Sequence, residues 1–420
     1  MGWIGMNRRD FLRTSGGLAA LGVGLRAAPA LARGLAGSES QLPPWQPGFL
    51  DIHHINTGRG NSALAILPDG TSLLIDAGAA TGQSLALNAP RPDASRRPGQ
   101  WIARYVQRQL RATSAAGLDY ALMTHLHGDH VGQLGADCPD SETGKYKLTG
   151  ISDVAETVSI TKLIDRGFPE YDFPEKATDP NALNYIAFAR SRQARGLAVE
   201  QVRVGSATQI APLRRGSGAE NCAVRILAGN GQVWSGEGEN AVPHFPANPN
   251  PIPPENNCSI ALRLSYGKFA YFTGGDLNCD TNYGQQPWLD VESVAAKVCG
   301  QVSVSTCDHH GYFDATGPEM VRALRPRAWV MQSWHASHPA LSVLANLYSQ
   351  TLYPGERNVF CLSLNPATAL ATARFSDGFK SSQGHVVVRV EPGGARYSVL
   401  VVDDRDETGR VQAAFGPYAS

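Results

Sequence analysis

One short segment constrains this chain more than any other: residues 124–130 run Thr-His-Leu-His-Gly-Asp-His, directly after the apolar run 120–123. Four side chains that commonly bind metals therefore lie within six residues. A strand that ends in such a turn directs two imidazoles at one cation and leaves the Asp-His pair for a second cation roughly 3.5–4 Å away. These ligands suit Zn²⁺, and also Fe or Mn. A histidine-rich polar loop is the alternative, and the position of this spacing after an apolar strand argues against it.

The first 32 residues have the pattern of an export signal. Residues 7–13 (Asn-Arg-Arg-Asp-Phe-Leu-Arg) match the twin-arginine pattern. A weakly apolar Gly/Ala/Leu segment (16–31) follows, and Ala-Leu-Ala at 30–32 predicts cleavage after Ala32. The apolar segment is too short and too rich in glycine to span a bilayer. We therefore expect a periplasmic or secreted protein, exported by the twin-arginine pathway, whose mature chain has no membrane span.

The charge balance gives no strong nucleic-acid footprint. The chain has 37 basic and 37 acidic residues and a formal net charge of zero. Removal of residues 1–32 takes away four arginines and one aspartate, which leaves 33 basic against 36 acidic residues. Bulk electrostatic attraction to a polyanion is not expected at this balance. The seven cysteines, odd in number and without a Cys-x-x-Cys pair, predict no disulfide framework.

Secondary-structure signals place one domain at 47–420, after a flexible leader at 33–46. Two apolar runs around a Pro-Asp-Gly turn predict a hairpin at 62–75. Residues 138–255 form a less regular, insertion-rich region, and the Pro/Asn-rich stretch 241–255 is predicted to be loop. The other predicted strands are 49–55, 118–123, 197–204, 223–227, 258–265, 268–273, 302–305, 328–332, 386–390 and 398–402, the last two forming a final hairpin, and the predicted helices are 100–112, 181–193, 292–298 and 319–324.

The His-x-His-x-Asp-His segment after a strand resembles the signature of the metallo-β-lactamase fold superfamily. Further blocks resemble the ComEC-type branch of that superfamily, in family order across roughly residues 48–345. These blocks are Asn-Thr-Gly-Arg-Gly-Asn-Ser at 56–62, Ile-Asp-Ala-Gly at 75–78, Asn-Asn-Cys-Ser at 256–259, Thr-Gly-Gly-Asp at 273–276, His-His-Gly at 309–311 and His-Pro at 338–339. The resemblance implies an αββα sandwich, with two mixed sheets face to face, helices outside, and the site at one edge where strand ends meet.

The resemblance also implies two divalent metal ions bridged by a hydroxide, zinc first, with manganese or iron as alternatives. The implied ligands are His125 and His127 for the first ion, Asp129 and His130 for the second, Asp276 as a bridge between them, and His309 to complete the second position. Two cations that share a water make hydroxide available near neutral pH and polarise the scissile bond. Asp129 would also be catalytic, because its carboxylate can orient the hydroxide or take up its proton.

One ligand of the family pattern has no clear match in this chain. His244, in a Pro-rich loop, is the only histidine between the first cluster and Asp276, and it is a weak ligand candidate. The first ion would then need a further ligand. His310 and His338 are the candidates, and either side chain could instead contact the substrate.

Four other residues are predicted to support the fold or the site rather than bind metal. Asp76 follows a strand, and we expect its carboxylate to hold the metal loop by hydrogen bonds, although a turn-forming role is the alternative. His53 and His54 lie in the first strand, and one of them is expected to pack or to form hydrogen bonds in the core. His385 is expected to be structural.

These expectations combine into an exported dinuclear-metal hydrolase with a small-molecule or phosphodiester substrate. A phosphoester is the first choice, because nuclease and phosphorylcholine-esterase relatives occur in the ComEC-type branch. Hydrolysis of a β-lactam or a lactone on the same fold is one alternative. A non-catalytic exported metal-binding protein is the other.

Overall fold

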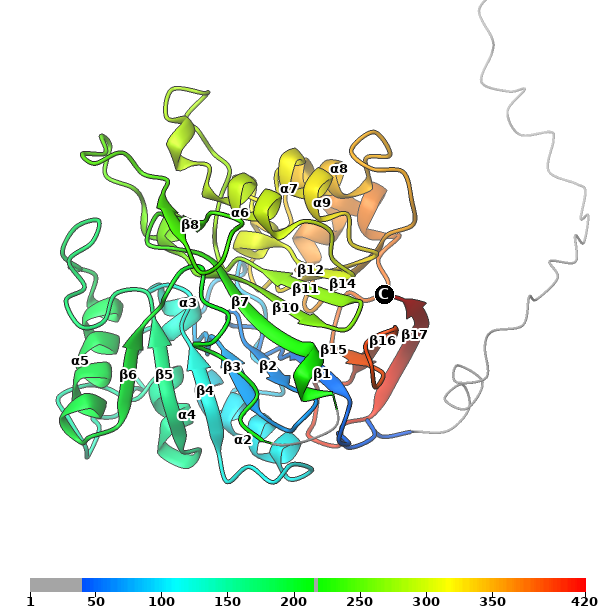
Figure 1. Cartoon of the computed structure of the whole chain (residues 1–420). Coiled ribbons are helices and arrows are strands. Elements are labelled where there is room, and N and C mark those ends of the chain that lie inside the picture. Colours follow the sequence, from blue (N-terminus) through cyan, green and yellow to red (C-terminus); the bar gives the residue numbers. More distant parts are fainter. Residues whose placement is uncertain (1–39, 215–217) are drawn as a thin grey trace, which may run out of the picture.

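The structure is a computed structural model that describes residues 40–214 and 218–420. The export signal expected at 1–32 lies outside the described residues. Two mixed β-sheets lie face to face and helices cover both outer surfaces (Figure 1). This is the αββα sandwich that the sequence predicted.

The first sheet has nine strands in the order β17-β16-β15-β1-β2-β3-β4-β5-β6. The strands from β3 to β6 run parallel to one another, and the other neighbouring pairs are antiparallel. Their bounds are β1 (Leu50–His54), β2 (Ala63–Ile66), β3 (Ser72–Ile75), β4 (Leu118–Leu122), β5 (Ile160–Asp165), β6 (Ala198–Gln201), β15 (His385–Val390), β16 (Arg396–Val402) and β17 (Val411–Ala419).

The second sheet has eight strands in the order β14-β13-β12-β11-β10-β7-β8-β9. The strands from β11 to β14 are parallel, and the others pair antiparallel. Their bounds are β7 (Cys222–Gly229), β8 (Gln232–Trp234), β9 (Ala241–Pro243), β10 (Ala261–Tyr266), β11 (Phe269–Thr273), β12 (Val304–Thr306), β13 (Ala328–Met331) and β14 (Asn358–Cys361).

The helices form the two outer layers. On the first sheet they are α2 (Pro98–Leu110), α3 (Gly128–Val131), α4 (Ile151–Thr157) and α5 (Pro180–Ala194); on the second they are α6 (Val291–Cys299), α7 (Pro318–Leu324), α8 (Leu341–Tyr348) and α9 (Pro366–Ser376). Short 3-10 turns lie at η2 (Ala219–Asn221), η3 (Glu255–Cys258), η4 (Pro287–Leu289) and η5 (Asp308–Gly311). One apolar core fills the space between the sheets. A second core lies between the first sheet and its helices, and a third lies between the second sheet and its helices.

The strands that carry the site are buried on both faces. In β3, which leads to Asp76, Leu73 and Ile75 pack into the core between the sheets, whereas Leu74 packs beneath the helices. Successive side chains of a strand point to opposite faces, so a strand with helices on one side and a sheet on the other needs a continuous apolar run. Such runs fix the register of these strands and therefore the places where the polar loops begin.

The structure corrects two expectations about elements. The stretch 241–255 is not all loop: β9 pairs with β8, and Glu255 begins η3. The 386–402 hairpin does not end the chain, because β17 adds an edge strand after it. Residues 40–46, expected in the leader, contact the domain through a Gln41–Arg410 bridge and the buried indole of Trp45.

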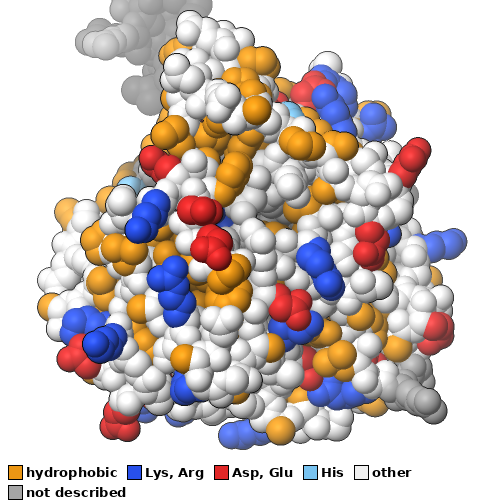
Figure 2. Space-filling view, turned by 60° about the vertical axis from the view of Figure 1, so that its left-hand side comes forward, with side chains coloured by type: hydrophobic (Ala, Val, Ile, Leu, Met, Phe, Trp, Pro, Cys, Tyr) orange, Lys and Arg blue, Asp and Glu red, His pale blue; other side chains and the backbone are white. Residues whose placement is uncertain are grey.

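Three features of the described residues concern membrane spans, surface charge and cysteines. Among the described residues, no helix is long and apolar enough to cross a membrane. On the face shown in Figure 2, basic and acidic side chains are intermixed rather than gathered by sign. All seven cysteines are free, and six of them are buried.

Candidate metal centre

The His-rich segment lies at the carboxyl end of β4, where the chain turns into the short helix α3. His125 and His127 lie in the turn, and Asp129 and His130 lie in α3. The turn leaves the sheet, so its polar side chains need not enter either apolar core. The strand thus delivers four ligand-type side chains to one edge of the sandwich, as the sequence predicted.

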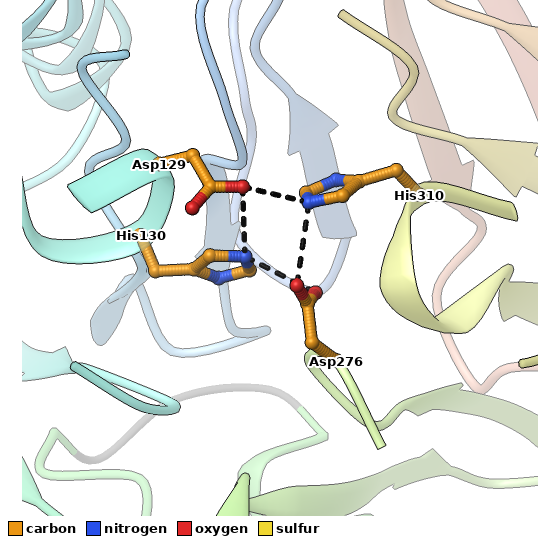
Figure 3. Close-up of side chains that lie close together, drawn as sticks. All are labelled: Asp129, His130, Asp276 and His310. Carbon is orange, nitrogen blue, oxygen red and sulfur yellow. Dashed lines mark hydrogen bonds and ion pairs between the residues drawn. The ribbon is translucent and has the colours of Figure 1, made fainter. Parts of the chain in front are cut away.

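A first compact set consists of Asp129, His130, Asp276 and His310 (Figure 3). His130 Nε2 lies 3.1 Å from Asp276 Oδ1, and His310 Nε2 lies 2.9 Å from Asp129 Oδ2 and 3.4 Å from Asp276 Oδ2. The residues come from α3, from the loop after β11 and from η5 after β12. Both sheets therefore contribute to this set.

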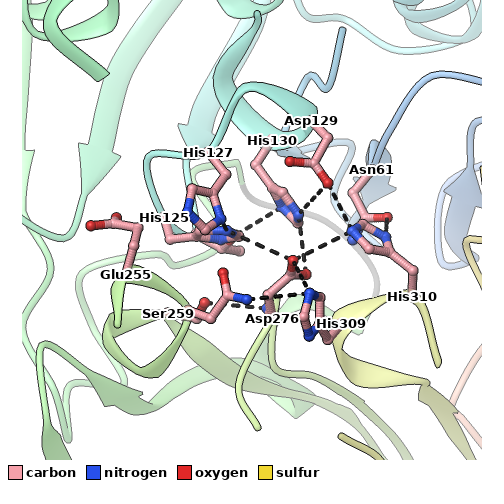
Figure 4. Close-up of polar contacts among 12 residues, drawn as sticks. Asn61, His125, His127, Asp129, His130, Glu255, Ser259, Asp276, His309 and His310 are labelled. Carbon is pink, nitrogen blue, oxygen red and sulfur yellow. Dashed lines mark hydrogen bonds and ion pairs between the residues drawn. The ribbon is translucent and has the colours of Figure 1, made fainter. Parts of the chain in front are cut away.

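A second set consists of His125, His127 and Asp276 (Figure 4). His125 Nε2 lies 3.0 Å from His127 Nδ1 and 3.8 Å from Asp276 Oδ2. Asp276 belongs to both sets: its Oδ1 lies near His130 and its Oδ2 lies nearer His125. A carboxylate in this position can bridge two cations.

The donor atoms of both sets fit divalent metal ions. A tetrahedral zinc ion with bonds near 2.0–2.1 Å keeps its ligand atoms roughly 3.3 Å apart, close to the spacings seen here. His130 Nε2 and Asp276 Oδ1 are buried and have no hydrogen-bond partner, although only 3.1 Å separates them. Buried polar atoms without partners are costly, and a shared cation would satisfy both of these.

Asp76 supports the site, as predicted. Its Oδ2 lies 2.8 Å from His130 Nδ1 and accepts a hydrogen bond from the Thr124 hydroxyl at 2.9 Å, while its Oδ1 accepts from the Thr124 amide at 2.8 Å. A proton on Nδ1 that is donated to Asp76 leaves the Nε2 lone pair of His130 free for a metal. The Asp76 carboxylate therefore sets both the orientation and the tautomer of this imidazole.

The side chains of the first compact set determine one another's charge states. Burial alone would lower the pKa of His130, but Asp276, Asp76 and Asp129 raise it well above its ordinary value. Burial would likewise raise the pKa of Asp276, but His130 and His310 hold it well below the ordinary value. The carboxylates of Asp129 and Asp276 therefore stay ionised and need nearby positive charge, which divalent cations would supply in place of imidazolium protons.

Two adjacent histidines lie beside Asp276. His309, named from the sequence for the second position, has its Nε2 3.8 Å from Asp276 Oδ2 and its Nδ1 2.6 Å from Asp314 Oδ1. His310, named as a further candidate, lies in the compact set with Asp129, and its Nδ1 lies 2.9 Å from Asn61 Oδ1. Both histidines have positive φ angles, 46° and 58°, and this sharp turn brings both rings to the site.

His309 lies outside both sets, and so do the other two candidates. His338 is buried beside the site: its ring centroid is 5.0 Å from that of His310, and its Nδ1 has no hydrogen-bond partner. His244 instead lies near Asp290, a carboxylate that partly offsets the lowering of its pKa by burial. The compact set at the first position therefore contains only the two histidines of the His-x-His turn, and His309 Nε2 lies 3.8 Å from the Asp276 oxygen nearest to them.

Sequence reasoning missed two residues that hold ligand loops. Glu255 Oε1 accepts a hydrogen bond from the Leu126 amide at 2.8 Å, between the two histidines of the His-x-His turn. Ser259 Oγ accepts from the Asp276 amide at 3.2 Å (Figure 4). Ser259 belongs to the Asn-Asn-Cys-Ser block, whereas no local pattern singles out Glu255.

One sequence comparison gives a match to a known superfamily. Residues 56–136 match the sequence profile of the metallo-beta-lactamase superfamily. A search of curated proteins finds no significant match. Among solved structures, the chain is similar to the short form of human tRNase Z at 14% identity, over 61% of this chain and 77% of that one, with a TM-score of 0.26.

The profile match covers the strands and the His-rich turn that build half of the metal centre. Together with the two mixed sheets between helical layers, it defines a metallo-β-lactamase fold. The profile match, the fold and the two ligand sets indicate a metal-dependent hydrolase.

Proposed function

We propose that this protein is an exported dinuclear-metal hydrolase that cleaves a phosphoester, with phosphodiesters as the preferred class. The observation that carries the proposal is the position of Asp276, shared by two compact ligand sets. Bridging carboxylates of this kind are typical of two-metal hydrolytic sites. Export is supported by the twin-arginine pattern at residues 7–13.

Two bound divalent ions would supply an ionised water near neutral pH and neutralise charge that develops on the substrate. The residues of the chain perform the other tasks. Asp129 is only partly buried, and its carboxylate is placed to orient the nucleophile or to take up its proton. His310 Nε2 lies 2.9 Å from that carboxylate and would complete the same ligand set, and the buried ring of His338 packs against His310.

The choice of a phosphoester is supported by the ComEC-type order of blocks in the sequence and by the ligand sets. A lactamase of this fold would be expected to use a histidine between the first cluster and the bridging aspartate. The only histidine there, His244, lies outside both sets. Two cations held by the two ligand sets would suit a phosphodiester without that histidine. Each cation could contact one of the phosphate's unesterified oxygens and offset its negative charge.

The test is a comparison of two chromogenic substrates with the zinc-loaded and manganese-loaded protein. We expect bis-p-nitrophenyl phosphate to turn over faster than nitrocefin, and Asp276→Ala to reduce the activity to background. Asp280→Ala is the matched control, because Asp280 is an exposed aspartate four residues away. Faster nitrocefin turnover would indicate a lactamase instead, and less than about one equivalent of bound metal would refute the dinuclear centre.

A further inference from the structure

The first metal position has fewer protein ligands than the second. The first position has two histidines and the bridging carboxylate of Asp276. The second has Asp129, His130 and His310 in addition to the same carboxylate. Two side chains on a flexible turn are poorly ordered for metal binding unless something else fixes the turn. A contact that fixes the peptide between His125 and His127 would order both side chains.

The Leu126 amide in that peptide is held by Glu255. Glu255 Oε1 accepts its hydrogen bond at 2.8 Å and also accepts one from Arg166 Nε at 2.6 Å. A second contact joins Arg166 Nη2 to Glu255 Oε2, which makes the pair bidentate. Bidentate arginine–carboxylate pairs fix geometry as well as charge, so the acceptor for the Leu126 amide has a defined position.

Arg166 is itself anchored on three sides. Only 3% of its side chain is exposed, and its Nη1 donates to the Phe173 carbonyl at 2.8 Å and to Asn230 Oδ1 at 3.0 Å. Arg166 directly follows β5 of the first sheet, whereas Asn230 lies in the turn between β7 and β8 of the second. The arginine thus ties both sheets to Glu255 at the edge of the sandwich that carries the site.

The segment that starts at Glu255 also touches the other ligand loops. Asn256 Nδ2 lies 3.2 Å from His309 Nε2, and Ser259 Oγ accepts from the Asp276 amide. The Ile260 amide donates to the Thr124 carbonyl at 3.0 Å, just before the His-x-His turn. Residues 255–260 therefore lie against the loops that carry His125, Asp276 and His309 (Figure 4).

We propose that the Arg166–Glu255 pair is the positioning device of the first metal position, and that its hold on the Leu126 peptide provides the order that a third histidine ligand would otherwise give. The proposal rests on the dinuclear centre proposed above. It assigns a role to the insertion-rich region 138–255, which contains both residues. Glu255 is a positioning residue, because it belongs to neither ligand set.

The test measures zinc binding to metal-free protein by calorimetry and chelator competition, for the wild type and for Glu255→Ala, Glu255→Gln and Arg166→Met. In Glu255→Ala we expect one of two binding steps to weaken by about 10–100-fold, as is typical when a residue that orients a ligand is removed. Glu255→Gln keeps an oxygen for the Leu126 amide but loses one arm of the bidentate pair with Arg166, so that step should weaken less than in Glu255→Ala. Arg166→Met frees the carboxylate and should weaken the same step by more than threefold.

The weakened step can be assigned by comparison with Asp76→Asn, which acts on His130 and thus on the second position. The two variants should weaken different steps, and their losses should add in the double variant. Asp51→Ala is the control for loss of a buried ion pair elsewhere, since Asp51 pairs with Arg389 between β1 and β15. It should leave both zinc affinities unchanged.

Three outcomes would overturn the proposal: unchanged zinc binding in Glu255→Ala, equal weakening of both steps, or equal losses in the Ala and Gln variants, which would indicate a charge effect. If Glu255→Ala does not fold by circular dichroism, Arg166→Met decides, and wild-type affinity in that variant refutes the proposal. Failure of the dinuclear centre has a different signature, because the wild type itself would then bind fewer than two zinc ions.

Discussion

Acidification should destabilise this protein in part through histidines that lie in its core, outside the metal centre. His54 is fully buried in β1: its Nδ1 lies 3.1 Å from the Val386 carbonyl in the same sheet, and its Nε2 lies 3.0 Å from the Tyr271 hydroxyl in the opposite sheet. Burial lowers the pKa of His54 from its ordinary value of 6.5 to about 4. Its neighbour His53 is equally buried, and burial lowers its pKa to about 4 as well.

The sign and size of the effect follow from these values. Between about pH 4 and 6.5 the unfolded chain binds a proton on His54 that the folded chain does not, so stability is lost as the pH falls through this window. The loss for one such histidine is about 2 kcal/mol at pH 5 and about 3 kcal/mol at pH 4. Two of them would remove about 4 kcal/mol at pH 5, a large part of the 5–15 kcal/mol typical of folded domains.

The assay is urea unfolding of metal-free wild type and His54→Gln, followed by circular dichroism between pH 7.5 and pH 5. Glutamine does not titrate, so the stability advantage of the wild type over the variant should shrink by about 2 kcal/mol across this range. Contributions from the metal ligands cancel, because both proteins retain them. His385→Gln offers an independent variant with the same expected sign, since burial lowers the pKa of His385 to about 3. A stability difference that stays constant from pH 7.5 to pH 5 would refute the reasoning.

Two further predictions concern the metal centre. Asp76→Asn should weaken the second zinc by about 10–100-fold, because an amide has only one oxygen and cannot accept from both the Thr124 amide and His130 Nδ1, as the carboxylate does. Asparagine tolerates the positive φ of 60° at this position, so a loss reflects the contacts rather than backbone strain. Wild-type affinity would contradict the role given to Asp76. Chelator-treated protein should gain about 2.7 kcal/mol of stability when free zinc reaches 100 times its dissociation constant. Thermal melting with and without zinc measures this gain, and an unchanged melting temperature would contradict a preformed metal centre in the folded state.

The sequence predicted the central elements well because their signals are local. The hairpin around Pro68-Asp69-Gly70 and the amphipathic helix near residues 100–112 appear in the structure as β2–β3 and α2. Elements near the C-terminal end were harder to predict. In β17 the alternation is interrupted by Gly416 and Pro417, and pairing with β16, rather than the pattern of its own residues, stabilises it.

The sequence predicted which loops carry the ligands, but it did not always predict which residue of a loop lies in the site. His125, His127, Asp129 and His130 follow from one motif, and the structure brings all four to Asp276. The order of His309 and His310 in the site depends on two consecutive left-handed backbone conformations, which no spacing rule specifies. Glu255 and Arg166 are separated by 89 residues and carry no periodic signal, so only the folded structure shows their contact.

The direction of the strands explains both why the ligands were predictable and why Glu255 was not. The residues of the site follow the carboxyl ends of strands: Asp76 after β3, His125 after β4, Asp276 after β11 and His310 after β12. Parallel strands place these ends at one edge of a sheet, which is where sites form in such folds. β10 runs antiparallel to β11, so the segment before its amino end, with Glu255, reaches the same edge. Residues that precede antiparallel strands can therefore reach the same edge and support the ligand loops, although they do not follow a strand's carboxyl end.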